Sequence, residues 1–463
     1  MLEGSLEGRE WVRERWWYKL VHVCPRWRYL ILGSASYLGL CLVCTTSTPV
    51  ADMLAHSPPL PLVINYVQNN PDSEITAEDE EGFTHALQHS NRVRRICLRI
   101  HEPNLQKFVA SVDGEYPMLE YLNIRPPTKT RSCLILPETF RAPNLRHVVL
   151  KNFAFPRGSP LVTTAVPVGL VTLCLLKAFP SAYLQPKDLL QLLASMPQLE
   201  TLWIEFLFPV PNHEIERQLL SMPTTTRVTL PNLYRFRFGG VNPYLEAILR
   251  QITAPRLEKL HIMFFSQLTF SVPYLLQFIE TTEDIRFSVA RFRFSRTGVC
   301  AKMYLSEGSK MYAFHIGVPS THLDWQVASV AQLFNALNPV FSTVEHLTLE
   351  GKIRSLPLDL EENHEVDHTN WHGFLRSFGN VKILVVDDSL VRVLSQSLRS
   401  DDGELHVDLL PALMELKCNA DDVFTSFVDA RQNVGRPVAL SRYLSSFSDS
   451  REPLCATSAP ASG

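Results

Sequence analysis

The sequence predicts an α/β solenoid, an elongated array in which each repeat contributes one strand and one helix. Three observations predict it: a short apolar pattern recurs along most of the 463 residues, prolines precede it at a fixed distance, and helix-like segments separate its copies. Apolar residues make up 46% of the chain, which is enough to build a substantial core. A single repeat cannot bury its own apolar face, so the core forms only when neighbouring repeats stack on it.

The recurring pattern is an apolar residue followed by apolar residues three and five positions later. Leucine-rich repeats carry L-x-x-L-x-L on their strand and are about 20–29 residues long. The spacing of the first copies fits this length, and the longer later gaps indicate insertions. We therefore expect an irregular leucine-rich-repeat-like solenoid of strand–helix repeats. The copies begin at Leu119, Leu145, Leu170, Leu199, Leu233, Leu257, Val344, Val381 and Leu413, with weaker ones at Val93, Asp284 and Met311.

Proline stands two residues before the leading apolar residue in many copies. Proline cannot continue a helix and keeps the preceding residue extended. We expect each proline to end a helix just before the next strand. These prolines are Pro117, Pro143, Pro197, Pro231, Pro255 and Pro411.

The segments between copies carry helix start signals and apolar residues at helical spacing. The expected helices start at Pro186, Asn242, Asp324, and Thr369 or Asn370.

Residues 284–316 differ from these segments, because their alternating pattern predicts longer strands, with a hairpin turning at Ser295–Gly298.

The N-terminal segment 11–32 reads WVRERWWYKLVHVCPRWRYLIL. Five of its apolar residues fall at helical spacing on one face, which predicts a helix that caps the first repeat. The following apolar stretch, Leu30–Cys44, is short for a membrane span, so we expect helix plus strand and no membrane contact. The five residues of the predicted face are Trp16, Leu20, Val23, Trp27 and Leu30.

The same segment resembles the second half of an F-box and the strand after it. WxxLVHVCxRWRxxI is followed by Leu38, Leu40 and Leu42, as in the large F-box-like families of mushroom-forming fungi. WHGFLRSFGNVKILVVDDSLVRVLSQSL at 371–398 and DDVFTSFVDARQNVGRPVAL at 421–440 resemble that family's C-terminal signature. The resemblance covers most of the chain. It implies a substrate receptor of an SCF-type cullin–RING ubiquitin ligase, with a Skp-type adaptor on the F-box and a protein target on the repeats.

Two features depart from the F-box pattern. Only MLEGSLEGRE precedes Trp11, so the usual Leu-Pro start and first apolar helix are missing, and Pro25 stands where a polar or basic residue is usual. A proline inside a helix removes a hydrogen bond, so the helix should kink or start late. The alternative is a solenoid scaffold that has lost adaptor binding. The adaptor-binding positions that the resemblance implies are Trp16, Leu20, Val21, Val23, Cys24, Trp27, Leu30 and Ile31.

The expected organisation has four parts. Residues 1–48 form a partial F-box-like helical segment, and 49–90 form a linker and N-terminal cap. The solenoid covers 91–420, and 421–463 hold a C-terminal cap helix and a disordered Ser-, Ala- and Pro-rich tail.

One motif could carry chemistry. His364-Glu365-Val366-Asp367-His368 matches H-E-x-x-H, which on a helix binds zinc through both histidines and uses the glutamate as base. The remote alternative is thus a zinc-dependent hydrolase using His364, Glu365 and His368. Its flanks are polar, however, and the expected helix starts after it. With no phosphate-binding or nucleophile-elbow motif either, we expect no catalytic, cofactor or metal site and no enzyme.

Charge and cysteine usage narrow the partners. A net charge of −3 favours a protein partner over nucleic acid. The nine scattered cysteines suit reduced, buried thiols in a cytoplasmic or nuclear protein. Cys41 and Cys44 form a CxxC without a second pair, which argues against zinc. Arg92, Arg94, Arg95 and Arg99 are expected to form a solvated face or to match an acidic partner.

Overall fold

The computed structural model describes two compact units of this chain. Unit 1 comprises Met1–Pro211 with Val228–Leu233, and unit 2 comprises Asn212–Arg227 with Tyr234–Gly463. The residues that the structure describes are 16–68, 75–101, 104–126, 133–154, 169–178, 183–207, 227–265, 267, 269–282, 286–309, 311–351, 368–398, 408–419 and 421–442.

Unit 1 is built on a parallel sheet whose described strands follow one another in chain order. Two further short strands, β5 (Leu134–Ile135) and β7 (Phe153–Ala154), pair separately. The strands of the main sheet are β1 (Leu42–Thr45), β2 (Leu62–Val67), β3 (Val93–Arg99), β4 (Tyr121–Ile124), β6 (His147–Lys151), β8 (Thr172–Ala178) and β9 (Thr201–Phe206).

Unit 2 contains a second run of strands in which β15 alone among the described strands is antiparallel to its neighbours. The predicted hairpin is confirmed, because Ser295 pairs with Gly298 at its tip. In spatial order the strands are β11 (Arg235–Gly240), β13 (Lys259–Phe264), β16 (Phe314–Val318), β15 (Gly298–Tyr304), β14 (Val289–Ser295), β17 (His346–Gly351), β18 (Ile383–Val386), β19 (Glu415–Lys417) and β20 (Ala439–Ser441).

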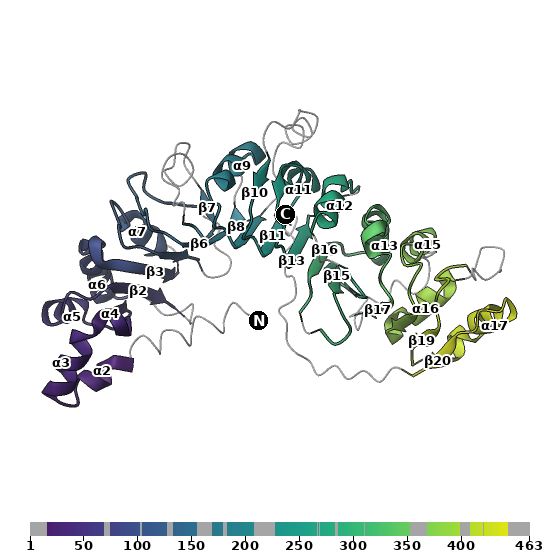
Figure 1. The fold of residues 1–463 in the computed structure, drawn as a ribbon, viewed down its shortest axis with the longest axis horizontal. Helices are drawn as coiled ribbons and strands as arrows, with labels where there is room; N and C mark the ends of the chain where they lie inside the picture. Colours follow the sequence, from purple (N-terminus) through teal and green to yellow (C-terminus); the bar gives the residue numbers. More distant parts are fainter. Residues whose placement is uncertain are drawn as a thin grey trace. The chain divides into compact units, whose positions relative to one another are not determined.

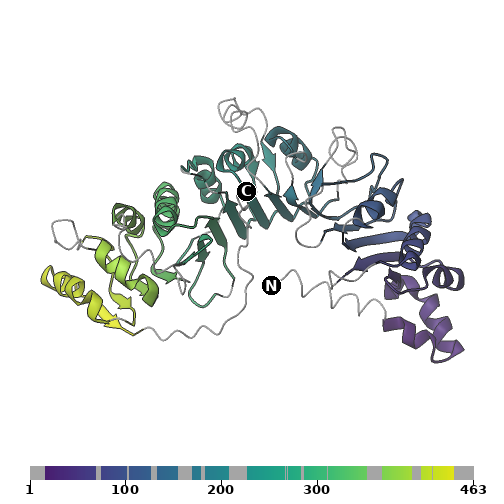
Figure 2. The same ribbon diagram turned by 180° about the vertical axis from the view of Figure 1, so that it is seen from behind.

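The helices of each unit cover one face of its strands (Figures 1 and 2). In unit 2, α11 (Asn242–Leu249) packs against α12 (Pro273–Glu280), and α13 (Leu323–Ala336) packs against α15 (His368–Arg376). Unit 1 contains α2 (Trp16–Val21), α3 (Pro25–Gly33), α4 (Ala35–Leu38), α5 (Val50–His56), α6 (Ala77–Gln88), the 3-10 turn η1 (Ser90–Arg92), α7 (Asn104–Ser111), α9 (Pro186–Ala194) and the short strand β10 (Val228–Thr229). Unit 2 also contains the short strand β12 (Ile252–Thr253), α14 (Asn338–Phe341), α16 (Asp388–Ser397), η4 (Asp421–Phe424) and α17 (Thr425–Asn433).

The leading apolar residue of each repeat lies in the core beneath the strand that follows it. Leu119, Leu199 and Leu233 are fully buried, and the third and fifth positions after them are buried too. The backbone N–H of the leading residue donates to the carbonyl three residues earlier, for example Leu119 N to Tyr116 O. The preceding proline is thus the second residue of a β-turn, a position whose fixed φ suits proline. The expectation that each proline ends a helix is wrong, because the short strands β10 and β12 precede Pro231 and Pro255. The chain is therefore an irregular leucine-rich-repeat-like α/β solenoid, as predicted.

The weak copy predicted to begin at Asp284 is wrong by three residues. Val289 pairs with His346, two residues after the leading Val344, so the equivalent leading residue in this repeat is the buried Phe287. The weak copies at Val93 and Met311 have the predicted register, because Ile96 pairs with Leu122 and Phe314 with Leu260. The apolar pattern alone could not separate the two registers of a segment that alternates throughout.

The four predicted helices are present, and α13 and α15 begin one residue before their predicted starts. α9 begins at Pro186 as expected. Asn242 lies inside the first turn of α11, and Asp324 lies inside that of α13, whose N-cap is His322. α15 begins at His368, one residue before the predicted start. An acidic residue inside the first turn still interacts favourably with the helix dipole.

The N-terminal segment is two helices rather than one. α2 ends at Val21, and α3 begins with Pro25 in its first turn, where proline has no hydrogen bond to lose. The late start that Pro25 predicts is confirmed, whereas the single continuous apolar face from Trp16 to Leu30 is wrong. After α4 the chain enters β1, so helix followed by strand is confirmed for Leu30–Cys44. The parallel sheet therefore includes β1 and β2, N-terminal to residue 91.

Candidate partner-binding face

The strand face of unit 2 that is not covered by helices carries a continuous row of side chains, one from each strand. Each of these residues pairs directly with the next one on the neighbouring strand, so adjacent residues of the row lie about 4.8 Å apart. We call this face the open face and this set the central row. Its members are Arg237, His261, His315, Lys302, Arg291, Thr348, Val385, Lys417 and Ser441.

Strand alternation explains why these residues share one face. In β14 the even-numbered residues Ala290, Phe292 and Phe294 are buried against the helices. The odd-numbered Arg291 and Arg293 are only partly buried and point to the other side. The same alternation in β11 places Phe236 and Phe238 in the core and leaves the arginines between them on the open face.

The open face of unit 2 is basic. Among the described strand residues on this face, arginines and lysines outnumber the carboxylates. Glu350 accepts from Arg293, with Nε–Oε2 at 2.8 Å, and lies 3.5 Å from Arg291 Nε. One carboxylate therefore faces two guanidinium groups. The basic residues are Arg235, Arg237, Lys259, Arg291, Arg293, Lys302 and Lys417, and the acidic ones are Glu350 and Glu415.

Two neutral histidines stand within the basic row. His261 Nδ1 lies 3.1 Å from His315 Nδ1, so one ring donates and the other accepts. Burial, with Arg237 and Lys302 nearby, lowers the pKa of His261 to about 3. Burial also holds the pKa of His315 well below its ordinary value, and the charges of Lys302, Arg237 and Arg293 lower it further. The pair therefore supplies polar contacts at neutral pH without adding charge to the row.

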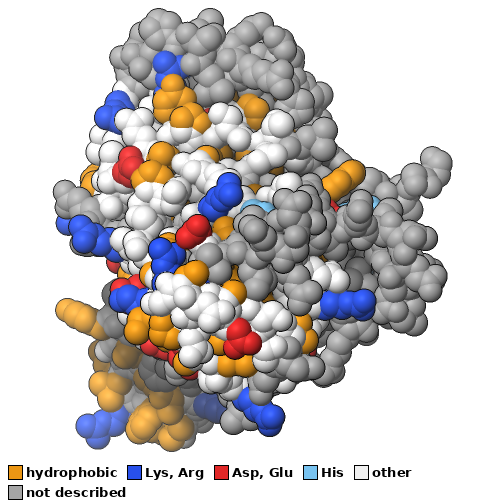
Figure 3. Space-filling model, turned by 90° about the vertical axis from the view of Figure 1, so that its right-hand side faces the viewer, with side chains coloured by type: hydrophobic (Ala, Val, Ile, Leu, Met, Phe, Trp, Pro, Cys, Tyr) orange, Lys and Arg blue, Asp and Glu red, His pale blue; other side chains and the backbone are white. Residues whose placement is uncertain are grey.

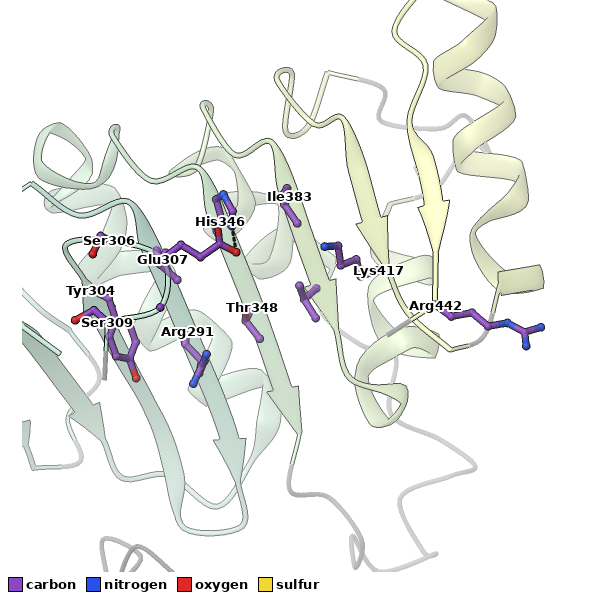
Figure 4. A pocket seen from close by; sticks show the side chains of 13 residues that line it. Arg291, Tyr304, Ser306, Glu307, Ser309, His346, Thr348, Ile383, Lys417 and Arg442 are labelled. Atoms are coloured by element: carbon purple, nitrogen blue, oxygen red, sulfur yellow. Dashed lines mark ion pairs between the residues drawn. The ribbon is translucent and has the colours of Figure 1, made fainter. Parts of the chain in front are cut away.

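A hollow of about 380 Å³ opens on this face (Figure 4). Its floor is formed by residues of β14, β15, β17, β18 and β19, and one wall by the turn 306–309. Glu307 reaches from this turn toward His346, with Oε1 and Nδ1 3.6 Å apart. The guanidinium carbon of Arg291 lies 5.5 Å from the centre of the Tyr304 ring. The hollow thus offers cations, one aromatic ring and small polar side chains to a ligand.

The basic side chains are separated rather than massed. In the central row, two histidines separate Arg237 from Lys302, and Thr348 and Val385 separate Arg291 from Lys417. At the end of the molecule that Figure 3 shows, lysines and arginines also lie as individual groups among other atoms. Duplex nucleic acids bind to continuous basic stripes that follow their phosphates. The spacing here suits single carboxylates along a peptide instead.

The eight positions implied by the F-box resemblance lie on α2, on α3 and in the turn between them. Val21 and Ile31 are buried, and Leu20 and Cys24 are partly buried. Val23, Trp27 and Leu30 are exposed, with 44% of the Trp27 surface accessible. α2 begins at Trp16, whose side chain is outside the described part. The structure therefore separates core positions from exposed ones, which the sequence could not do.

The H-E-x-x-H motif falls almost entirely outside the described residues. His364, Glu365, Val366 and Asp367 are not described, and His368 is described only as the first residue of α15. The tail after residue 442 also lies outside. Within the described ranges, no group of three or more His, Cys, Asp or Glu is placed to hold a metal ion. In the same ranges, no helix has the length and apolarity to cross a membrane.

The cysteine and arginine predictions can be compared with their positions. Cys41, Cys44, Cys97, Cys174 and Cys418 are buried, as expected for structural thiols. Arg92 donates through Nε to Leu60 O at 3.0 Å, and Arg94 pairs with Glu120 at 2.9 Å. These two arginines therefore serve contacts within the chain.

Sequence reasoning missed the central row. Its signal was present in the polar members of alternating segments such as RFRF at 235–238 and ARFRF at 290–294. Those positions point away from the core whenever their neighbours are buried.

Neither a protein-family model nor a curated protein matches the chain in sequence. Among solved structures, it is similar to the leucine-rich repeat-containing protein LegL7 from Legionella pneumophila, at 13% identity and a TM-score of 0.25. The match covers 81% of this chain and 89% of that one. At this level the likeness carries no statement about function.

Proposed function

We propose that the chain is a non-catalytic protein-binding module whose open face in unit 2 holds an acidic segment of a partner protein. The central row carries this proposal, because it aligns Lys302 and Arg291 on adjacent strands and places Lys417 farther along the same row. Guanidinium groups bind carboxylates bidentately, and the hollow beside Arg291 gives such a group a place to sit. Solenoids commonly bind partners on their strand surface.

A defined peptide tests the proposal. A fluorescein-labelled oligoglutamate should bind the full chain with an affinity that falls as salt rises, and oligolysine should not bind. Replacing Arg291 and Lys302 with glutamine should weaken oligoglutamate binding roughly tenfold or more. The control pair, Arg256→Gln and Arg250→Gln, removes the same charge outside the open face. If both pairs of substitutions had the same effect, the binding would be non-specific and the proposal would fail.

We also propose that the helices α2–α4 are the remaining part of an F-box of the fungal type. Their exposed apolar side chains support this, because Val23, Trp27, Leu30 and Tyr29 are accessible on a short helical segment. Exposed apolar groups that lie together mark protein contact sites. In this proposal a Skp-type adaptor binds here and the repeats present a target for ubiquitination, in the cytoplasm or nucleus.

Adaptor binding is tested by titrating the folded chain with a Skp-type adaptor. Trp27→Ala and Leu30→Ala should weaken binding by more than tenfold, since buried aromatic anchors dominate interfaces. Tyr37→Ala removes a ring that is 97% exposed on α4 and lies outside the eight implied positions, and it should leave the affinity unchanged. No binding by the folded wild-type chain would favour the scaffold that has lost its adaptor.

A further inference from the structure

A second basic feature lies in unit 1, on the strand face away from the helices. Arg99 ends β3, Arg125 follows β4, and Lys151 ends β6. Two residues before these cations, Asn123 pairs with Cys97 on one side and with Val149 on the other. Arg125 N donates to Leu98 O, so the strand pairing extends as far as the three cations. They therefore occupy one cross-strand row on three neighbouring parallel strands. We call it the unit 1 cation row.

The cation row faces away from the core. The residue directly before each cation is buried beneath the sheet; these residues are Leu98, Ile124 and Leu150. Alternation then places the cations on the other face, where Arg99 is exposed and Lys151 is half-buried. Side chains in such a row are about 4.8 Å apart at their bases, close enough for two of them to share one small anion.

The row concentrates like charge. Burial lowers the pKa of Lys151, and the charges of Lys177, Arg99 and Arg125 lower it further, against Glu205, which raises it. Lys177 directly follows Leu176, the residue of β8 that pairs with Lys151, and its backbone is left-handed with φ of 51°. Like charges on directly paired strand positions destabilise a sheet. An anion bound between them would remove that repulsion.

An apolar patch adjoins the row. Val149, Cys174 and Leu176 form a buried cluster on the same face, with the ring of Trp203 packed against it. Leu176 pairs directly with Lys151, and Val149 lies two residues before Lys151 on the same strand, about 7 Å away. The second spacing matches residues two positions apart in an extended peptide.

We propose that the unit 1 cation row binds a phosphate monoester, held by Arg99, Arg125 and Lys151 beside the apolar patch. The fork of arginine and the point charge of lysine are complementary to a dianionic oxyanion. The partly exposed ring of Trp203, packed on the buried cluster, favours a phosphorylated side chain of a partner protein over a free phosphate ester. In naming a protein partner this rests on the proposed function, but the site lies on another unit and its anion binding can be measured without any partner.

Inorganic phosphate is the first probe. At constant ionic strength, phosphate should raise the melting temperature of the full chain more than chloride does, with saturation. Lys151→Met and Arg99→Gln should weaken phosphate binding roughly tenfold or more. Arg95→Gln is the matched control, since Arg95 lies on β3 and the same face, two residue pairs from Arg99. It should leave phosphate affinity within about twofold.

Peptides distinguish the source of the phosphate. An array of phosphoserine and phosphothreonine peptides with their unphosphorylated forms should show phosphate-dependent binding, enhanced by an apolar residue two positions away. Trp203→Ala should reduce the apolar preference but leave the affinity for inorganic phosphate unchanged. If the chain bound inorganic phosphate but no phosphopeptide more tightly than inorganic phosphate, the site would be assigned to a small phosphate ester. The partner assignment would then be overturned.

Equal responses to phosphate and chloride, or equal affinities of the wild type and Lys151→Met, would overturn the site itself. Because Lys151→Met could alter folding, its unfolding in urea is measured alongside. Removing one charge from a repelling row should keep or raise stability. Failure here would leave oligoglutamate binding at unit 2 unaffected, so the two proposals fail separately.

Discussion

His261 and His315 lie side by side on adjacent strands with their Nδ1 atoms 3.1 Å apart. The contact requires at least one neutral ring, because one Nδ1 must accept from the other, and burial lowers the pKa of each. In the unfolded chain a histidine binds a proton near pH 6.5. Between that value and the folded pKa, the unfolded state binds more protons, so acid favours unfolding.

We therefore expect the free energy of unfolding to fall as the pH drops below about 6.5, by roughly 2 kcal/mol at about pH 5 for His261 alone. Urea unfolding at the two pH values measures this change. His261→Gln should show a smaller acid loss than the wild type. His322→Gln, which removes an exposed histidine, should keep the full loss, and an equal loss in both variants would contradict the assignment.

Arg431 secures the last repeats. Its fully buried guanidinium donates to the carbonyls of Leu409, Pro411 and Leu413, which line the turn before β19. Arg431→Met should cost about 3 kcal/mol or more, because these acceptors lose their donors inside the protein. Urea unfolding and hydrogen exchange of α17 provide the measurements. Arg436→Met removes an exposed pair with Asp408 and should change stability by less than about 1 kcal/mol.

Glu246 joins two successive helices of unit 2. From α11 its carboxyl oxygens accept from Tyr274 N at 2.8 Å and Leu275 N at 3.0 Å, at the start of α12. Burial raises the pKa of Glu246 to about 7, although both hydrogen bonds oppose the shift. Glu246→Ala should destabilise the protein by roughly 1–3 kcal/mol, because both amides lose their acceptor.

The pH dependence at Glu246 has the opposite sign to that of the histidines. The folded state holds a proton that the unfolded state releases near pH 4.5, so this contribution is lost as the pH rises toward 7. Relative to the wild type, Glu246→Gln should therefore gain stability between about pH 5 and pH 8. The exposed Glu280→Gln should show no such trend.

Gly298 closes the tip of the β14–β15 hairpin with φ of 152°. A Cβ there would lie 2.5 Å from Val318 O and 2.8 Å from Pro319 Cα, both backbone atoms. Gly298→Ala should cost about 1–3 kcal/mol in thermal or urea unfolding. Gly379→Ala is the control: a Cβ at Gly379 has no atom within 4 Å, and the change should stay within about 1 kcal/mol.

The repeat pattern predicted the core because leading residues such as Leu199 and Val381 must be buried wherever strands stack. The repeat pattern does not include β1 and β2, whose strands are apolar on both faces, although the apolar run before Cys44 did predict a strand. Cys41, Val43 and Val63 form a cluster on the side away from the helices, which conceals the alternation. A continuous apolar run cannot reveal which face is core.

The candidate site was less predictable from sequence than the fold. Arg291 and Lys302 become neighbours only because β14 and β15 form a hairpin, and His261 meets His315 only because β16 pairs with β13. Glu307 reaches His346 from a turn whose place no local pattern specifies. These contacts depend on strand order, which the local pattern does not determine.

The reversed strand β15 has a consequence for the order in which the chain can fold. In an ordinary repeat array each new strand docks on the one synthesised just before it. Here β14 is made directly after β13 and α12, yet the place beside β13 belongs to β16. The ribosome therefore releases β14 before β15 and β16, which connect it to β13, have been made. Docking of new strands onto the folded part should pause until these two strands have also emerged. The strands β14, β15 and β16 should then assemble as a single cooperative block, the one step among the described strands of unit 2 that cannot proceed repeat by repeat.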